Sequence, residues 1–295
     1  MTKKYLVGLV GESIEHSLTP DLHMQEARHL GLEYEYRIID LLDPNLSEMS
    51  FEEVLAEATR SGYAALNVTH PFKQVALNSL KTSSSEVLEV GATNLVLQPG
   101  AGIHGENTDW SGFLFAIGQT IPNAKRELVI QVGSGGAGGA TAYALLKWGV
   151  ARLVVTDIDL SKAQSLALRY QALFPSSRIE AVEMDEALSL FGASDGVVNA
   201  TPIGMYGHPG LPFNIETLNP LAWVADVVYR PIETELISQA RLAGHVVVAG
   251  GLMAIGQAAD SLRLITGLEP SIDRMRDHFM ELLEDETALT RSKGI

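Results

Sequence analysis

The chain alternates short apolar runs with segments whose apolar residues recur at helical spacing. The apolar runs are strand-length and rich in Val, Ile and Leu, and they span residues 5–11, 34–40, 63–68, 93–98, 127–133, 152–158, 196–201, 223–229 and 245–251. Strands alternating with helices predict an α/β protein with largely parallel sheets. The last five runs are the more continuously apolar, which is typical of strands buried on both faces of a sheet.

A glycine-rich turn at residue 133 opens this second group of strands. The turn predicts a nucleotide domain that begins near residue 113. After residue 251 the pattern predicts two helices, at residues 252–267 and 272–290. Periodicity alone does not show where these two helices pack.

Composition narrows the possible functions. A formal net charge of -15 and 46% hydrophobic residues indicate a globular protein that would be repelled by nucleic acid or an anionic membrane. The chain has no Cys, so it forms no disulfide or thiolate metal site, and we predict no metal site. No stretch approaches the roughly 20 apolar residues of a membrane span, and the first residues lack a signal-peptide cleavage site. We expect a cytoplasmic protein; its oligomeric state cannot be derived.

The glycine turn has the spacing of a dinucleotide site. Gly133, Gly135 and Gly138 form a G-x-G-x-x-G pattern directly after a strand and at the start of a helix. Glycine allows the tight turn, the approach of the backbone to a pyrophosphate, and the packing of helix against strand. A glycine-rich turn without a ligand is the alternative. The residues expected to contact the cofactor here are Gly133, Ser134, Gly135, Gly136, Ala137 and Gly138.

Asp157 ends the next predicted strand, nineteen residues beyond Gly138. A carboxylate there accepts hydrogen bonds from the adenosine ribose hydroxyls and repels a 2′-phosphate. Lys162 is the one nearby cation. As an alternative, Asp157 or Asp159 caps the following helix, which is more plausible for Asp159. The pattern predicts NAD rather than NADP as the cofactor.

Polar side chains are dense in four stretches before the glycine turn. These are "EHSLTP" (15–20), "NVTHPFK" (67–73), "GATNLV" (91–96) and "GENTDWSG" (105–112). Taken singly, the first could be a helix N-cap and the last a turn with Asx bonding. Their order, followed by the glycine turn, "NATPIGM" (199–205), "DVVYRP" (226–231) and "GLMAIGQAADS" (251–261), resembles the shikimate dehydrogenase family from about residue 8 to residue 265.

The resemblance implies a two-domain enzyme with a cleft between the domains. An N-terminal α/β substrate domain would cover residues 1–112 and be completed by the C-terminal helices at 252–295. A Rossmann-type, doubly wound parallel-sheet nucleotide domain would cover residues 113–251. The family interconverts a cyclic polyol acid and its ketone with a nicotinamide cofactor.

The resemblance also assigns roles to individual residues. Ser17 and Thr19 would bind the substrate carboxylate, and Lys73 and Asp109 match the catalytic pair that also contacts the substrate. The residues that would hold ring hydroxyls are Asn67, Thr69, Asn94 and Gln257. Tyr229 would line the cleft, and Thr201 would contact the cofactor. Met205 would pack on the nicotinamide, and Gly251 would approach it through its backbone.

The chemistry of the residues agrees with this assignment. Oxidising a secondary alcohol requires a base that removes the hydroxyl proton as hydride leaves. Lysine is a poor base at its ordinary pKa of roughly 10.4, but desolvation lowers that value and a nearby carboxylate partly restores it. Lys73 would shuttle the proton, and Asp109 would orient it. His70 has the more convenient pKa but precedes Pro71 on an extended strand end, so it need not point the same way as Lys73.

The sequence departs from the family pattern at two places. Asp157 stands where biosynthetic members commonly carry a basic cluster suited to NADP, and Thr19 replaces the second serine of the carboxylate pair. Both departures resemble the NAD-dependent quinate/shikimate dehydrogenase branch, so quinate and shikimate are the expected substrates. An NADP-linked biosynthetic shikimate dehydrogenase is the alternative enzyme. A non-catalytic sensor of the polyol acid is disfavoured because it would not need both Lys73 and Asp109. His16, beside the carboxylate pair, is expected to be a loop histidine, with a part in binding the carboxylate as the alternative.

Overall fold

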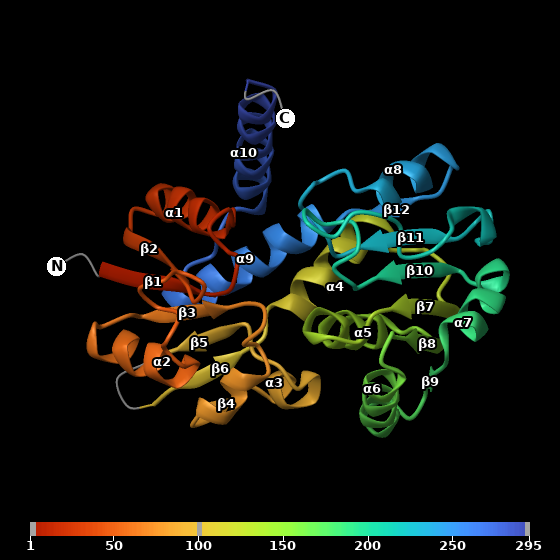
Figure 1. Cartoon of the computed structure of the whole chain (residues 1–295), viewed down its shortest axis with the longest axis horizontal. Coiled ribbons are helices and arrows are strands. Elements are labelled where there is room, and N and C mark those ends of the chain that lie inside the picture. The colour runs from red at the N-terminus through yellow and green to blue at the C-terminus, as the bar shows by residue number, and fades with distance from the viewer. Residues whose placement is uncertain (1–3, 99–101, 293–295) are drawn as a thin grey trace. The chain divides into compact units, whose positions relative to one another are not determined.

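The computed structural model describes residues 4–98 and 102–292, and its contacts divide the chain into two compact units (Figure 1). The first unit joins Met1–Thr108 to Ile255–Ile295, and the second is Asp109–Ala254. The sequence places these divisions after residues 112 and 251. Each unit contains a six-stranded sheet with helices, which confirms the predicted α/β class.

The sheet of the first unit has the strand order β2-β1-β3-β5-β6-β4. Its strands are β1 (Lys4–Gly11), β2 (Glu33–Asp40), β3 (Ala65–Val68), β4 (Thr82–Ser83), β5 (Leu95–Leu97) and β6 (His104–Glu106). β1 runs parallel to β2 and β3, whereas β5 is antiparallel to both β3 and β6. The two strands run in opposite directions, so the polar residues that follow β3 and those that precede β5 lie at the same end of the strand pair.

The helices of the first unit lie between its strands in the sequence, apart from α10 near the C-terminal end of the chain. They are α1 (Thr19–His29), α2 (Phe51–Arg60), the short 3₁₀ helix η1 (Val75–Ser79), α3 (Ser85–Val90) and α10 (Ile272–Ser292). Helix α9 (Gly250–Thr266) carries the chain from the second unit back into the first. On one side of the sheet Phe51, Val54 and Leu55 of α2 pack with buried Leu66 of β3. This burial of apolar area holds the polar strand ends in place.

The second sheet is entirely parallel, with the order β12-β11-β10-β7-β8-β9 (Figure 1). Its strands are β7 (Leu128–Val132), β8 (Arg152–Thr156), β9 (Arg178–Ala181), β10 (Gly196–Asn199), β11 (Trp223–Asp226) and β12 (Val247–Val248). Counted from β7, this is the 3-2-1-4-5-6 order of a doubly wound dinucleotide fold. The predicted Rossmann topology is confirmed, and ligands of such sheets bind where the order reverses, here between β7 and β10.

Helices precede and connect these parallel strands, and α4 is the one that leads into β7. They are α4 (Asp109–Thr120), α5 (Gly136–Trp148), α6 (Leu160–Leu173), α7 (Met184–Leu190) with the short η2 (Phe191–Ala193), η3 (Ile215–Thr217) and α8 (Glu235–Leu242). The core between strands and helices includes Ile130, Val154, Val197, Phe191 and Leu236, each with no exposed surface. Among the described residues, no helix has the length and hydropathy needed to cross a membrane.

The end of the predicted strand at 245–251 is wrong. β12 is only Val247–Val248, and α9 already begins at Gly250. A Cβ at Gly250 would lie 2.6 Å from the carbonyl oxygen of Val228, so glycine permits the helix to start tightly against the chain that follows β11. Gly251 is thus a buried residue in the first turn of α9.

Candidate functional site

The glycine turn connects the end of β7 to the start of α5, and its glycines have separate roles. Gly133 has φ of +102°, and a Cβ there would lie 2.7 Å from the carbonyl oxygen of Ala200 after β10. A Cβ at Gly138 would collide with the carbonyl group of Gly133. At Gly135, the N-cap of α5, a Cβ would meet nothing within 4 Å. Two glycines therefore close the turn, and the third leaves open backbone at a helix N-terminus, which fits a phosphate.

A buried glutamine that the sequence pattern did not predict as part of the site braces this turn. Gln131 Nε2 donates 2.8 Å bonds to the carbonyl oxygens of both Gly133 and Gly138, while Thr141 Oγ1 donates to Gln131 Oε1 at 2.9 Å. Gln131 has no exposed surface. Its one signal in the sequence is a polar residue inside an otherwise apolar strand, "LVIQV".

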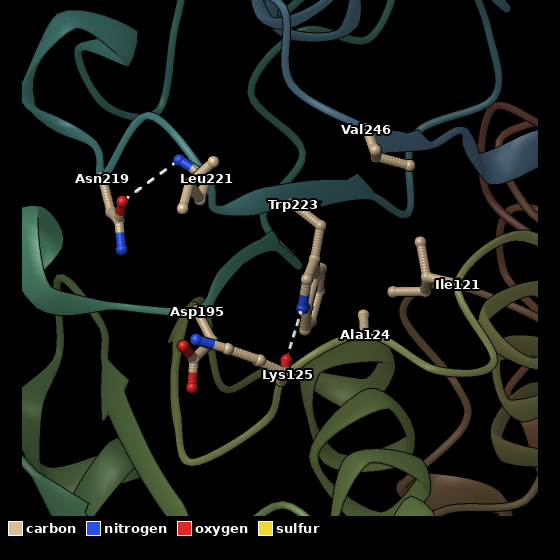
Figure 2. A pocket seen from close by; sticks show the side chains of 8 residues that line it. All are labelled: Ile121, Ala124, Lys125, Asp195, Asn219, Leu221, Trp223 and Val246. Atoms are coloured by element: carbon tan, nitrogen blue, oxygen red, sulfur yellow. Dashed lines mark hydrogen bonds between the residues drawn. The ribbon is translucent and has the colours of Figure 1, made fainter.

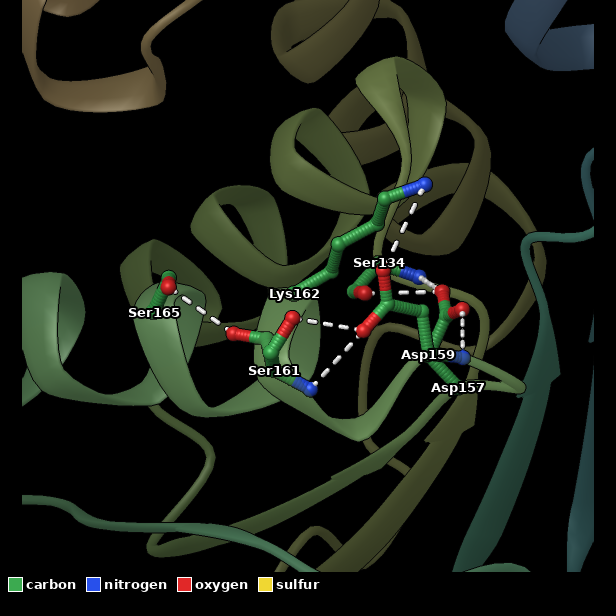
Figure 3. A network of polar contacts seen from close by, with 6 residues as sticks. All are labelled: Ser134, Asp157, Asp159, Ser161, Lys162 and Ser165. Atoms are coloured by element: carbon green, nitrogen blue, oxygen red, sulfur yellow. Dashed lines mark hydrogen bonds and ion pairs between the residues drawn. The ribbon is translucent and has the colours of Figure 1, made fainter.

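Asp157 follows β8 directly and is bound to the glycine turn (Figure 3). Oδ2 of Asp157 accepts two 2.7 Å bonds, from the backbone N–H and from the hydroxyl of Ser134. Oδ1 accepts a 3.0 Å bond from the backbone N–H of Asp159. The carboxylate is thus held at the end of the first crossover, beside the expected phosphate site.

The N-cap of α6 is Asp159, and not Asp157 (Figure 3). Its Oδ1 accepts bonds from the backbone N–H and the hydroxyl of Ser161. These bonds, chiefly the one from the hydroxyl, hold the pKa of Asp159 below its ordinary value. Lys162 Nζ lies 4.0 Å from Oδ2 of Asp159. The capping alternative therefore applies to Asp159, and Asp157 makes different contacts.

A buried carboxylate organises the loop after β10, which carries Thr201. Thr201 bonds to Oδ1 of Asn199 through its backbone N–H and its hydroxyl, and Asn199 Nδ2 donates to Oδ1 of Asp226 at 2.9 Å. Asp226 also accepts bonds from the backbone N–H of Val228 and the hydroxyl of Thr234. Burial raises the pKa of Asp226 to about 6. The sequence reasoning did not single out this network, which connects the ends of β10 and β11.

The other residues expected near the cofactor follow the same strands. Met205 lies in the loop after Thr201 and is 40% exposed. Tyr229 follows β11 and is half-buried, and Gly251 is buried at the start of α9. Thr201, Tyr229 and Gly251 thus lie at the carboxyl ends of the parallel strands, where the ligands of such a sheet are expected to bind.

In the first unit, Ser17 and Thr19 lie at the N-terminus of α1, half-buried. The backbone N–H of Thr19 donates to Ser17 Oγ at 3.3 Å. Within the described part of the chain, neither hydroxyl donates a hydrogen bond, so both O–H groups can serve a ligand. His16 is exposed and pairs with its neighbour Glu15 at 3.0 Å.

Asn67 and Asn94 are buried, and their amides are held by side-chain and backbone groups of the same unit. The hydroxyl of Tyr36 donates to Oδ1 of Asn67 at 2.8 Å, and the backbone N–H of Thr108 donates to Oδ1 of Asn94 at 2.7 Å. Ser261 of α9 contacts both Asn67 and Thr108. Tyr36, Thr108 and Ser261 were not predicted as site residues, since their contacts join segments that are separated in the sequence.

Lys73 lies in the turn that follows β3 and is half-buried. Its carbonyl oxygen accepts a 2.9 Å bond from the backbone N–H of Thr93, which places Lys73 close to Asn94. Thr69 starts this turn, since its carbonyl oxygen accepts from the backbone of residue 72. His70 is exposed and precedes a cis proline.

Asp109 and Gln257 are presented by helices. Asp109 is the first residue of α4 and belongs to the second unit, where it is 5% exposed. Gln257 lies on α9 in the first unit, one turn before Ser261, and is half-buried. Across residues 4–98 and 102–284, whose side chains the structure describes, no group of three or more His, Asp or Glu side chains could hold a metal ion.

A pocket of about 290 Å³ opens at the amino ends of the strands of the second sheet (Figure 2). It is lined by Ile121, Ala124, Lys125, Asp195, Asn219, Leu221, Trp223 and Val246. Trp223 begins β11, and its Nε1 donates to the carbonyl oxygen of Lys125 at 3.0 Å. None of the residues predicted from the sequence lies in it, and it is at the amino ends of the strands, away from the glycine turn.

Comparison with known proteins finds one family model for the N-terminal part of the chain and relatives that align with nearly all of it. A family model described as the shikimate dehydrogenase substrate binding domain matches residues 9–96. A shikimate dehydrogenase (NADP(+)) from Arthrobacter sp. is 45% identical over 96% of this chain and 97% of that protein. A quinate/shikimate dehydrogenase (NAD(+)) from Corynebacterium glutamicum is 42% identical over 96% of this chain and 100% of that protein.

A solved structure shows the same architecture. The quinate dehydrogenase from Corynebacterium glutamicum in complex with NAD superposes with a TM-score of 0.89 at 42% identity, covering 94% of this chain and 99% of that one. Relatives of similar identity thus carry both cofactor names, so the choice between NAD and NADP has to be argued from this chain's own residues.

Proposed function

The chain belongs to the shikimate dehydrogenase family, and we propose that it is an NAD-dependent dehydrogenase. It reversibly oxidises quinate to 3-dehydroquinate and shikimate to 3-dehydroshikimate. Its similarity to proteins named for both acids supports the substrate class. The observation that carries the cofactor preference is the Asp157 carboxylate, fixed on the glycine turn by Ser134.

The surroundings of Asp157 favour NAD. A carboxylate at this place accepts hydrogen bonds from the ribose hydroxyls and repels a 2′-phosphate. Lys162, the nearby cation, lies against Asp159, whose charge offsets its own. Ile158, next to Asp157, is fully exposed and offers an apolar surface of the kind on which an adenine ring packs.

The substrate carboxylate would bind at the start of α1. Ser17 and Thr19 provide two O–H donors there. The positive end of the helix dipole adds to the attraction of an anion. The ring hydroxyls would be held by the buried amides of Asn67 and Asn94, by Thr69 and by Gln257.

In this proposal Lys73 removes the proton from the reacting hydroxyl and returns it in the reverse direction. Asp109 orients the lysine and accepts a bond from the same hydroxyl. NAD, when bound, supplies the hydride acceptor. Its diphosphate would be held at Gly135 to Ala137, and Thr201, Met205, Tyr229 and Gly251 would line its nicotinamide end.

A second candidate is an NADP-linked shikimate dehydrogenase. It is favoured by the 45% identity to a relative that carries the NADP name. In that case Lys162 would have to leave Asp159 and bind the 2′-phosphate, with Asp157 still beside it. The repulsion between two anions makes this the weaker proposal.

The activity is tested by following the absorbance of reduced nicotinamide with purified protein, NAD or NADP, and either quinate or shikimate. We expect both acids to be oxidised and the 3-dehydro ketone to be found as product. The matched control is Lys73→Ala, which should abolish most of the signal at equal protein concentration. If neither acid were oxidised with either cofactor, the proposed function would be wrong.

A further inference from the structure

Four buried polar side chains of the first unit form one hydrogen-bonded chain. Nδ2 of Asn67 donates to Ser261 Oγ at 3.1 Å, and that oxygen lies 3.0 Å from Thr108 Oγ1. Thr108 Oγ1 accepts a 3.0 Å bond from Nδ2 of Asn94. Each of the four residues is at most 3% exposed. The two amides proposed to hold ring hydroxyls are therefore connected through two hydroxyls.

These bonds fix the direction in which each amide points. The backbone N–H of Thr108 lies 2.7 Å from Asn94 and can only donate, so the atom that it meets is the amide oxygen. The amino group of Asn94 then faces Thr108 Oγ1. At Asn67, the Tyr36 hydroxyl donates to the amide oxygen while Ser261 receives the amino group. Rotation of either amide would break both of its bonds.

Ser261 stands out among these residues because neither its helix nor its burial favours a hydroxyl. It lies inside α9 and has no exposed surface. Alanine has the higher helix propensity, and a buried hydroxyl is costly unless it is hydrogen-bonded. Asn67 and Thr108 supply those bonds, from residues 194 and 153 positions away in the chain. Its hydroxyl is engaged by both of these residues, so its effect on a ligand passes through them.

We propose that Ser261 is a positioning residue for substrate binding, which acts by holding the amides of Asn67 and, through Thr108, of Asn94 in the orientation that receives the ring hydroxyls. This inference rests on the proposed function. An amide has two N–H groups and two carbonyl lone pairs, and Asn67 uses one of each on Ser261 and Tyr36. The bonds thus determine where its second N–H and second lone pair point.

Ser261→Ala tests the proposal. The substitution removes the acceptor of the Asn67 amino group, and the space left by one hydroxyl oxygen is too small for a water molecule to replace it. The amide then turns toward another partner. We expect KM for quinate and shikimate to rise about five- to twentyfold, whereas kcat changes less than about threefold and KM for NAD stays unchanged.

Ser194→Ala is the matched control. Ser194 also has no exposed surface, and its hydroxyl donates only to the carbonyl oxygen of Phe191, in the second unit. This variant loses an equally buried hydroxyl without touching the two amides. Its KM values for both acids should equal those of the wild type, even if its melting temperature falls.

Substitutions of Thr108 give a second test. Thr108→Val has nearly the same shape but removes the hydroxyl between Asn94 and Ser261, whereas Thr108→Ser keeps it. We expect the valine variant to raise KM for the acids and the serine variant to leave it near the wild-type value. In Ser261→Ala combined with Thr108→Val, the increase in KM should be smaller than the product of the two single increases, because both changes break the same connection.

The outcomes separate this inference from the proposed function. Wild-type protein that oxidises neither acid overturns the proposed function and this inference with it. Active wild type with an unchanged KM for the acids in Ser261→Ala overturns the inference alone and leaves Ser261 a structural residue. An equal rise in KM for the acids and for NAD also contradicts it, because that pattern indicates a general disturbance of the fold.

Discussion

The hydroxyl of Ser134 donates a 2.7 Å hydrogen bond to Oδ2 of Asp157, and the backbone N–H of Ser134 donates to the same oxygen at 2.7 Å. Ser134 belongs to the glycine turn, and Asp157 follows the next strand of the parallel sheet. The carboxylate is therefore held by the segment that would bind the cofactor's diphosphate. Charge-assisted bonds of this kind are stronger than neutral ones, so the position of Asp157 is well determined.

Asp157→Ala should weaken NAD binding and relax discrimination against NADP. Loss of hydrogen bonds to a charged group corresponds to a rise in KM for NAD of about 10- to 100-fold. Removal of the negative charge should at the same time improve kcat/KM for NADP. Steady-state kinetics with both cofactors measure the change.

Asp159→Ala is the control for this substitution. Asp159 caps α6, and its removal should lower the stability of the protein. KM for NAD should change far less than in the Asp157 variant. Equal losses in the two variants would mean that Asp157 has no special contact with the ribose.

Lys73→Ala should lower kcat by about 10² to 10⁴, the usual effect of losing a general acid or base, while KM for the acids rises less. His70→Ala should leave kcat within a few fold, because the His70 side chain is exposed to solvent. Both variants are compared by initial rates at saturating NAD. An inactive His70 variant beside an active Lys73 variant would reverse the assignment of the base.

Thr19→Ser should change the ratio of quinate to shikimate efficiencies several-fold, through KM more than kcat. The β-branched side chain of Thr19 restricts where its hydroxyl points, and its methyl group adds bulk beside the carboxylate site. Quinate carries an additional hydroxyl at the carbon that bears the carboxylate, and leaving that hydroxyl unpaired costs about 1 to 3 kcal/mol. Saturation curves for each acid measure the ratio, and an unchanged ratio would exclude Thr19 as its determinant.

Asp226 should make the protein less stable as the pH rises from about 4 to about 6. Burial raises the pKa of its carboxyl in the folded protein to about 6, whereas the unfolded chain has the ordinary value near 3.9. Between these values the folded state holds a proton that the unfolded state has released, so stability falls with rising pH and levels off above the folded pKa. A difference of about two pH units corresponds to about 3 kcal/mol.

Asp226→Asn isolates this effect. The amide oxygen can accept the bonds from Asn199 and Val228, and its amino group can donate to the Thr234 hydroxyl, so the network keeps its shape. Urea unfolding at several pH values should show that wild type loses stability relative to the variant across this window. A constant difference between the two proteins from pH 4 to pH 7 would show that Asp226 titrates normally.

The sequence was sufficient for the class of fold and for the glycine turn, because both depend on local patterns. Apolar strand runs and the spacing of Gly133, Gly135 and Gly138 identify the doubly wound sheet and its turn. The strands β4 (TS), β6 (HGE) and β9 (RIEA) were missed because none of them contains a run of apolar residues. The end of the last strand was placed too late, since close packing of Gly250 starts α9 early.

The support of the candidate site was not predictable in the same way. Gln131, Asp226 and Ser261 act through bonds to residues that lie elsewhere in the chain, and their own neighbours in sequence give little sign of it. Asp226 illustrates the difficulty, because "WVAD" looks like an ordinary strand end until Asn199 and Thr234 are seen to surround the carboxylate. Tertiary contacts of this kind are set by strand order, which a local pattern does not contain.

The most direct test of the proposed function compares cofactors and acids in one experiment. Initial rates are measured by reduced-nicotinamide absorbance with quinate and with shikimate, each at saturating concentration, over a range of NAD and of NADP. We predict a higher kcat/KM for NAD than for NADP with both acids, because Asp157 binds the ribose and repels the 2′-phosphate. A higher kcat/KM for NADP, or shikimate oxidation without any oxidation of quinate, would contradict the proposal.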